Sequence, residues 1–213
     1  MAKEYKNPAL TTDVILFSYD EEEKDFKVLL IKRKNEPFQD KWAIPRGFVE
    51  YDEELDTGAK RELEEETNVK IVNFEQLGTF GRPGRDPRGR TVSVVYYACV
   101  NPLKLNIKAQ DDAQDAQWFS IKKLPDLAFD HAEIMSCALE NLRMKIENTP
   151  VVSEFMSEEF SIAELQRVYE IILDRKLDHE KFKCEILKNN FLIRNNNSKY
   201  KFVSDIKFSS RFY

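Results

Sequence analysis

The sequence predicts an α+β sandwich followed by a small winged helix-turn-helix domain. In residues 1–148, β-branched and apolar runs are separated by turn residues, which is typical of strands. Helical segments are few in this part, and this favours an α+β sandwich over a doubly wound sheet. Residues 149–213 have the order helix, helix, hairpin, which is the outline of a winged helix-turn-helix. We therefore expect two domains, covering residues 1–148 and 149–213.

The first domain begins with a predicted hairpin formed by Thr12–Tyr19 and Phe26–Arg33, which flank an acidic turn. Helices are expected at Glu54–Thr67 and His131–Ile146, where apolar residues recur at helical spacing. The other strand-like segments are Trp42–Pro45, Gly47–Val49, Val69–Phe80, Thr91–Val100 and Gln114–Ser120.

The second domain follows a hinge expected at Asn148–Val152. Ser161 and Glu164 have the spacing of a capping box and predict the start of a helix over Ile162–Leu173. A second helix is expected at about His179–Lys188. The segments Phe191–Arg194 and Tyr200–Val203 then form the predicted hairpin.

The composition, with 42% hydrophobic and 33% charged residues, fits a globular protein. No apolar signal segment opens the chain, and the most apolar stretch, Val92–Val100, is too short to span a membrane. The three cysteines are isolated, so the sequence encodes neither a disulfide framework nor a CxxC metal site. We expect a cytoplasmic protein without a membrane partner.

Charge is distributed unevenly along the chain, whose net charge is -5. The segment Lys181–Tyr213 has 8 basic and 2 acidic residues, a net charge of +6. An acidic body with a basic end suggests two functions, although a solvated lysine-rich surface is the alternative.

One motif, between Gly47 and Val69, contains the residues most suited to binding a metal and to catalysis. It reads Gly47-x5-Glu53-x7-Arg61-Glu62-Leu63-x-Glu65-Glu66-x-Asn68-Val69. At about 100° per residue, Glu62, Glu65 and Glu66 project from one face of the predicted helix. Carboxylates at these spacings repel one another, so the face needs cations. Hard oxygen ligands favour Mg²⁺ or Mn²⁺. A solvated acidic helix is the alternative interpretation.

This motif resembles the Nudix box, G-x5-E-x7-R-E-U-x-E-E-x-G-U, in which U is aliphatic. Asn68 replaces the final glycine, and asparagine is the next best residue for a left-handed helix end. Arg46 stands where the family often has another glycine, and its side chain would lie beside the phosphates, where it would either help binding or crowd the substrate. The resemblance to the Nudix hydrolases implies an α/β/α sandwich with a mixed sheet.

The same resemblance implies the roles of the site residues. The implied metal ligands are Glu62, Glu65, Glu66 and the backbone at Gly47. Glu53, Arg61 and Glu65 are implied to take part in catalysis, with Arg61 orienting a carboxylate. The general base is less defined: Asp115, in an acidic segment with Asp111 and Asp112, is our candidate, and an ordinary acidic loop is the alternative.

A longer resemblance covers about residues 10 to 205 and points to one branch of the Nudix family. It is carried by the segments Gly84–Ala98, Asp111–Phe119, Leu127–Ile134 and Phe160–Leu187. The branch contains ADP-ribose pyrophosphatase-like proteins and Nudix-related transcriptional regulators with a C-terminal winged helix. Within it, phosphates or ribose-linked anions would be bound by Arg46, Arg82, Arg85, Arg88 and Arg90. A mobile solvated loop at residues 81–90 is the alternative.

Two functions therefore compete. The first is a Mg²⁺-dependent hydrolase that cleaves ADP-ribose, or a similar nucleoside diphosphate sugar, to AMP and a sugar phosphate. It is favoured because all three glutamates of the box are retained. The second is a regulator that senses such a ligand and binds double-stranded DNA, with phosphate contacts expected from Lys181, Lys183, Lys188, Lys199 and Lys201. A degenerate winged helix that serves dimerisation is a further alternative, and a homodimer is expected from the family.

Overall fold

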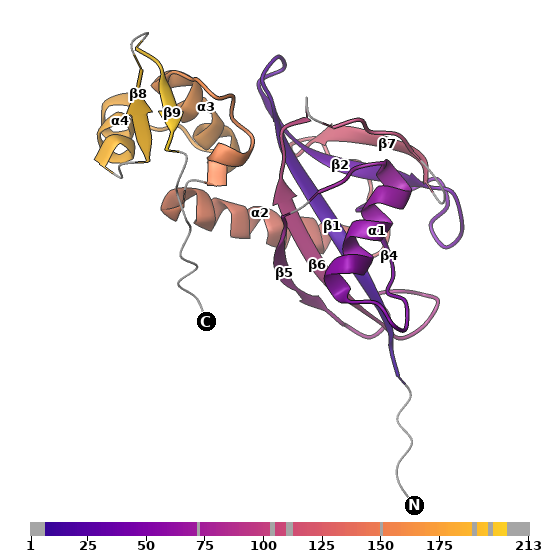
Figure 1. Cartoon of the computed structure of the whole chain (residues 1–213). Helices are drawn as coiled ribbons and strands as arrows, with labels where there is room; N and C mark the ends of the chain where they lie inside the picture. The colour runs from indigo at the N-terminus through magenta and orange to yellow at the C-terminus, as the bar shows by residue number, and fades with distance from the viewer. Residues whose placement is uncertain are drawn as a thin grey trace, which may run out of the picture. The chain divides into compact units, whose positions relative to one another are not determined.

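The computed structural model describes residues 7–71, 73–102, 105–109, 113–149, 151–188, 191–195 and 198–203. The chain divides into two units, Met1–Leu142 and Arg143–Tyr213 (Figure 1). The domain boundary expected after residue 148 lies at the end of a helix that begins in the first unit and ends in the second, and it stays a prediction.

The first unit is built on strands β1 (Ala9–Asp20), β2 (Asp25–Arg33), β3 (Trp42–Ala43), β4 (Arg46–Phe48), β5 (Glu75–Phe80), β6 (Thr91–Cys99) and β7 (Ala113–Ser120). Their order is β3-β2-β1-β6-β5, with β4 paired to β1 and β7 paired to β2. β1 and β2 form the predicted antiparallel hairpin, whereas β1 and β6 run parallel. The sheet is therefore mixed, and the predicted fold class is confirmed.

Helix α1 (Leu55–Thr67) lies against one face of this sheet (Figure 1). Its residues Ala59 and Leu63 are fully buried and pack with Val14, Leu16 and Leu29 of the sheet. Burial of a leucine of this kind contributes roughly 1.5–3 kcal/mol. This packing turns the opposite, acidic side of α1 away from the core.

The alternate residues of β1 point to the other face of the sheet, because side chains alternate along a strand. There Asp13 is fully buried, with its carboxylate 3.7 Å from Nε2 of His131. His131 begins helix α2 (His131–Asn148), and its Nδ1 accepts the backbone N–H of Ile44 at 2.9 Å. His131 thus joins the start of α2 to the segment between β3 and β4.

The second unit contains the 3-10 helix η2 (Val151–Glu154), helices α3 (Ile162–Leu173) and α4 (His179–Lys188), and strands β8 (Leu192–Arg194) and β9 (Tyr200–Phe202). Both hydrogen bonds of the predicted Ser161–Glu164 capping box are present at the start of α3. The rings of Phe160 and Phe202 pack with their centroids 5.0 Å apart. These elements form the predicted winged helix-turn-helix domain.

One element differs clearly from its sequence-based prediction. The strand expected at Val69–Phe80 is confined to Glu75–Phe80, because the described residues between 68 and 74 are irregular after α1. Within the described residues, no helix is long and apolar enough to cross a membrane.

Candidate functional site

A cleft of about 540 Å³ lies in the first unit between β4, the acidic side of α1 and the loops around them. It is lined by Thr11, Arg33, Asn35, Glu36, Arg46, Gly47, Phe48, Glu50, Arg61, Glu62, Glu65, Glu66 and Arg88. Carboxylates from α1 and three arginines from other segments therefore line one space. Such a concave, charged site is suited to a ligand that carries both phosphates and a bound cation.

Helix α1 ends as its sequence predicted. Asn68 is in the left-handed conformation with φ of 60°, and its N–H donates to the Glu64 carbonyl at 2.7 Å. The asparagine therefore keeps the helix end that a glycine would otherwise form, and the departure from the motif leaves the geometry intact.

Gly47 and Glu62 are in direct contact across the cleft. A Cβ built on Gly47 would lie 1.7 Å from Cδ of Glu62, which is an impossible distance for two carbons. Only glycine lets the carboxylate lie against the backbone of β4. This explains why the motif begins with glycine.

Glu66 is the most buried carboxylate of the motif, and it is 5% exposed. Its Oε2 accepts the backbone N–H of Arg46 at 2.8 Å. Burial raises the pKa of Glu66 to about 8, and the nearby charge of Glu62 adds to the shift. Burial also raises the pKa of Glu62. Both groups therefore resist carrying negative charge in the absence of a cation.

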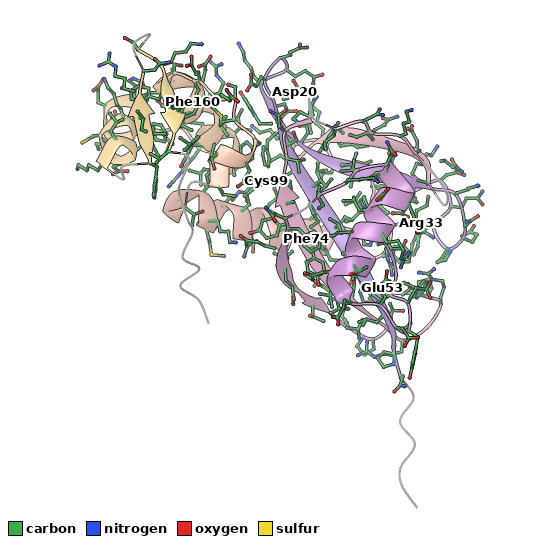
Figure 2. The ribbon with its side chains drawn as sticks, viewed as in Figure 1. Asp20, Arg33, Glu53, Phe74, Cys99 and Phe160 are labelled. Carbon is green, nitrogen blue, oxygen red and sulfur yellow. The ribbon has the colours of Figure 1, made fainter. Side chains whose placement is uncertain are left out.

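Arg61 holds the remaining acids of the motif together. It donates to both carboxylate oxygens of Glu53 at 2.8 Å, to Glu62 at 2.8 Å and to Glu65 at 3.0 Å. A further hydrogen bond reaches the carbonyl of Phe48 at 3.0 Å. These hydrogen bonds lower the pKa of Glu53, so that group is an anion that fixes the guanidinium. Figure 2 shows Glu53 beside the first turn of α1.

This donor set fits a divalent cation in part. Glu66 offers buried carboxylate oxygens, and the partly buried Glu62 lies next to the side-chain-free backbone at Gly47. Such hard oxygen ligands are what Mg²⁺ or Mn²⁺ prefers. Glu62 and Glu65 both accept hydrogen bonds from Arg61. In the described part of the chain, no group of three or more acidic, histidine or cysteine side chains stands ready around one point.

Two of the five arginines predicted to bind the substrate line the cleft, Arg46 and Arg88. The other three have partners elsewhere. Arg85 is buried and forms two hydrogen bonds with Asp130, at 2.7 and 2.8 Å. Arg82 pairs with Glu133 at 2.7 Å on the surface, and Arg90 donates to the carbonyl of Gly81. The structure thus brings only part of the predicted arginine set to the site.

Arg33 and the acids beside the arginines were not among the site residues predicted from the sequence. Arg33 lines the cleft from the end of β2. Asp13 and Asp86 are buried and lie 3.4 and 3.5 Å from the guanidinium of Arg46. Although burial opposes it, the hydrogen bonds from Arg88 lower the pKa of Asp86 to about 2. An aspartate surrounded by uncharged residues within a predicted strand, as Asp13 is, was the signal available in the sequence.

Asp115, the predicted general base, is not among the residues that line the cleft. It lies on β7 opposite Lys32, and its carboxylate accepts hydrogen bonds from the N–H of Ala116 at 2.8 Å and the amide of Gln117 at 2.5 Å. Asp111 and Asp112 lie outside the described residues.

The lysines predicted to bind DNA lie on the second helix and the hairpin of the second unit. Lys181, Lys183 and Lys188 are on α4, where Lys183 is half-buried and the other two are exposed. Two more lysines are exposed: Lys199 directly before β9 and Lys201 within it. Exposed acids, Asp178, Glu180 and Glu185, lie on or beside the same helix. The surface therefore has basic groups on both elements that a winged helix presents to DNA.

An acidic helix against a glycine of a short strand, within a mixed sheet, defines the class of protein to which the first unit belongs. This chain is a member of the Nudix family: the NUDIX domain matches residues 9–140. The NrtR DNA-binding winged helix domain matches residues 152–201.

Two relatives represent the two functions under consideration. The ADPR responsive transcriptional repressor NtrR of Acinetobacter baylyi is 33% identical over 200 residues, 92% of this chain and 79% of that protein. The ADP-ribose pyrophosphatase of Methanocaldococcus jannaschii is 43% identical over 131 residues, 62% of this chain and 73% of that protein.

Solved structures match either most of the chain or about two thirds of it. A MutT/nudix family protein from Enterococcus faecalis has a TM-score of 0.86 and 33% identity, covering 95% of this chain and 89% of its own. Shewanella oneidensis NrtR complexed with a 27mer DNA has a TM-score of 0.72 and 31% identity, covering 91% of each chain. The NUDIX domain of that NrtR complexed with ADP ribose has a TM-score of 0.59 and 36% identity, covering 65% of this chain and 90% of its own.

Proposed function

We propose that this protein hydrolyses the diphosphate of ADP-ribose, or of a similar nucleoside diphosphate sugar, to AMP and a sugar phosphate. The observation that carries the proposal is the cleft that Glu62, which lies against Gly47, and the buried Glu66 share with Arg33, Arg46 and Arg88. A diphosphate bound there would meet acids that hold a cation on one side and guanidinium groups on the other. The 43% identity to an ADP-ribose pyrophosphatase supports this choice of substrate.

In this proposal Glu62, Glu66 and the backbone at Gly47 would hold Mg²⁺ or Mn²⁺, and Glu65 would join them by leaving Arg61. The bound cation supplies charge neutralisation at the phosphates and a more acidic water. Glu53 and Arg61 position the acids. Water adds across the P–O–P bridge: its oxygen bonds to one phosphorus, and the bridging oxygen leaves with the other product and takes up a proton. We assign the general base to no residue, since Asp115 lies outside the cleft lining.

The test is Mg²⁺-dependent release of AMP from ADP-ribose by the full chain. Glu66→Gln should abolish it, because the amide keeps the hydrogen bond from Arg46 but loses the charge. Glu64→Gln is the matched control, since Glu64 lies on the same helix, pairs with Lys70 at 2.8 Å and does not line the cleft. Undiminished turnover in Glu66→Gln would remove the ligand assignment. A wild type that is inert toward a panel of nucleoside diphosphate sugars would refute the hydrolase proposal.

A second function is supported by the second unit. We infer that the chain is also suited to act as a DNA-binding regulator that senses ADP-ribose or a related ligand. The NrtR winged helix domain matches residues 152–201, and the likeness to an ADPR responsive repressor extends over 92% of the chain. The basic groups on α4 and β9 would contact DNA phosphates.

A gel shift with DNA from upstream of the protein's own gene, with and without ADP-ribose, tests the regulator. We expect a shifted band at low salt that ADP-ribose changes. No shift at low salt would refute DNA binding. The homodimer expected from the family belongs to this second proposal, because paired half-sites require two recognition helices, and sedimentation of the protein tests it.

A further inference from the structure

One aromatic ring contacts three of the four arginines that line the cleft. The guanidinium carbons of Arg46, Arg33 and Arg88 lie 4.5, 4.9 and 5.7 Å from the centroid of the Phe129 ring. All three distances are within the range of cation–π attraction. The arginines come from the end of β2, the start of β4 and the loop before β6, so only the tertiary fold brings them together. We call Arg33, Arg46 and Arg88 the arginine face.

The position of Phe129 is constrained both through its backbone and through its ring. Its backbone is in the left-handed region, with φ of 55°, which a phenylalanine adopts only under constraint. The preceding residue, Ala128, is buried and donates its N–H to the carbonyl of Trp42 at 2.8 Å. The ring of Phe38 packs on that of Phe129 with centroids 4.7 Å apart. The ring is therefore a fixed platform.

The arginine face carries more charge than its neighbours neutralise. Arg46 lies 3.4 Å from the carboxylate of Asp13 and shares the carboxylate of Asp86 with Arg88, so two carboxylates lie within ion-pair distance of the three guanidinium groups. Arg33 donates to the neutral carbonyls of Pro37 and Asn35, at 2.8 and 3.2 Å. Burial lowers the pKa of Arg33, and the charges of Arg46 and Arg88 lower it further. Three like charges at this spacing favour a polyanion in the cleft.

We propose that Phe129 is a positioning residue that gathers the arginine face, and that this face binds the diphosphate of the ligand. The inference deepens the proposed function, on which it rests for the identity of the ligand. Phe129 is not among the residues that line the cleft, so it acts through the arginines. Without the ring, the three guanidinium groups would be free to separate, and ligand binding would weaken.

The experiment measures binding to the full chain in the presence of a chelator, so that no cation bridges the ligand to the carboxylates. Calorimetric titrations use inorganic pyrophosphate and ADP-ribose. We expect Phe129→Leu to weaken both by roughly tenfold, because leucine removes the π-face of the ring. Phe129→Tyr keeps the ring and should bind within about threefold of the wild type.

Phe74→Leu is the matched control. Phe74 is also half-buried, also lies under a cation, with Lys60 5.3 Å from its ring, and is outside the cleft lining. In Figure 2, Phe74 and Arg33 lie on opposite sides of α1. This control should bind as the wild type does. In turnover assays with Mg²⁺, Phe129→Leu should raise KM more than it lowers kcat, which a general loss of stability would not do.

Wild-type binding in Phe129→Leu, or absence of pyrophosphate binding by the wild type in chelator, would overturn the proposal. If Phe129→Leu fails to fold, Arg33→Lys keeps the charge but loses the planar contact with the ring. It should weaken pyrophosphate binding about threefold, and unchanged binding would count against the proposal. A wild type that binds pyrophosphate but releases no AMP from ADP-ribose would refute the hydrolase while leaving the arginine face intact.

Discussion

The backbone N–H of Arg46 donates to the carboxylate of Glu66 across 2.8 Å, and this bond links the two halves of the cleft. The side chain of Arg46 belongs to the basic half, 4.5 Å above the ring of Phe129. Glu66 belongs to the acidic half on α1. Strand β4, in which Gly47 follows Arg46, therefore contributes to both the acidic and the basic half of the cleft.

The stability of the metal-free protein should depend on whether the carboxyl group of Glu66 is protonated. Its folded pKa, about 8, lies above the ordinary value of 4.5, so folding favours the protonated form. The stability from this group is full below pH 4.5 and is lost as the pH rises through about 8. The loss is at most about 5 kcal/mol. Denaturant titrations in chelator across this range should show it, and Glu66→Gln should remove most of it. Equal pH slopes in the two proteins would contradict the burial argument.

Gly47→Ala should destroy turnover without unfolding the protein. The three atoms nearest to the added Cβ all belong to the flexible carboxylate of Glu62, which would have to swing away. We expect turnover to fall by roughly 100-fold, as a displacement of about 1 Å can cause. The melting temperature should change little. Gly78→Ala is the control, because a Cβ there meets nothing within 4 Å. An active Gly47→Ala variant would show that Glu62 is not needed where it lies.

Arg61→Lys should impair both activity and stability. An ammonium group cannot reproduce the five hydrogen bonds that the guanidinium makes to Glu53, Glu62, Glu65 and the Phe48 carbonyl. We expect a loss of roughly 1–3 kcal/mol in the free energy of unfolding. Turnover should fall by at least about tenfold. Thermal melts and AMP release measure the two effects. Arg82→Lys, with its single exposed ion pair, should change neither.

Charge reversal on the hairpin should weaken DNA binding if the regulator proposal holds. Lys199→Glu combined with Lys201→Glu places acids where β9 would meet phosphates. Affinity should fall by at least about tenfold, and the dependence of affinity on salt should become shallower. Gel shifts over a salt series measure both quantities. Lys123→Glu, an exposed change in the first unit, should bind like the wild type. An unchanged double variant would place DNA contacts elsewhere.

Local patterns in the sequence determined most elements of both units and the acidic half of the cleft. Three to four residues per turn bring Glu62, Glu65 and Glu66 to one side of α1, and the left-handed end at Asn68 follows from the residue type. The capping box at Ser161 is equally local. Such features depend on neighbours within one or two turns, so a single chain reveals them.

Which residues form the basic half of the cleft was decided only by the tertiary structure. Which arginine reaches the cleft depends on acids distant in sequence: Arg85 is drawn away by Asp130, whereas Arg46 lies beside Asp13. Arg33 and Phe129 meet although 96 positions separate them in the numbering. No local periodicity encodes such pairings, because they arise when the strands take their order in the sheet and place buried charges side by side.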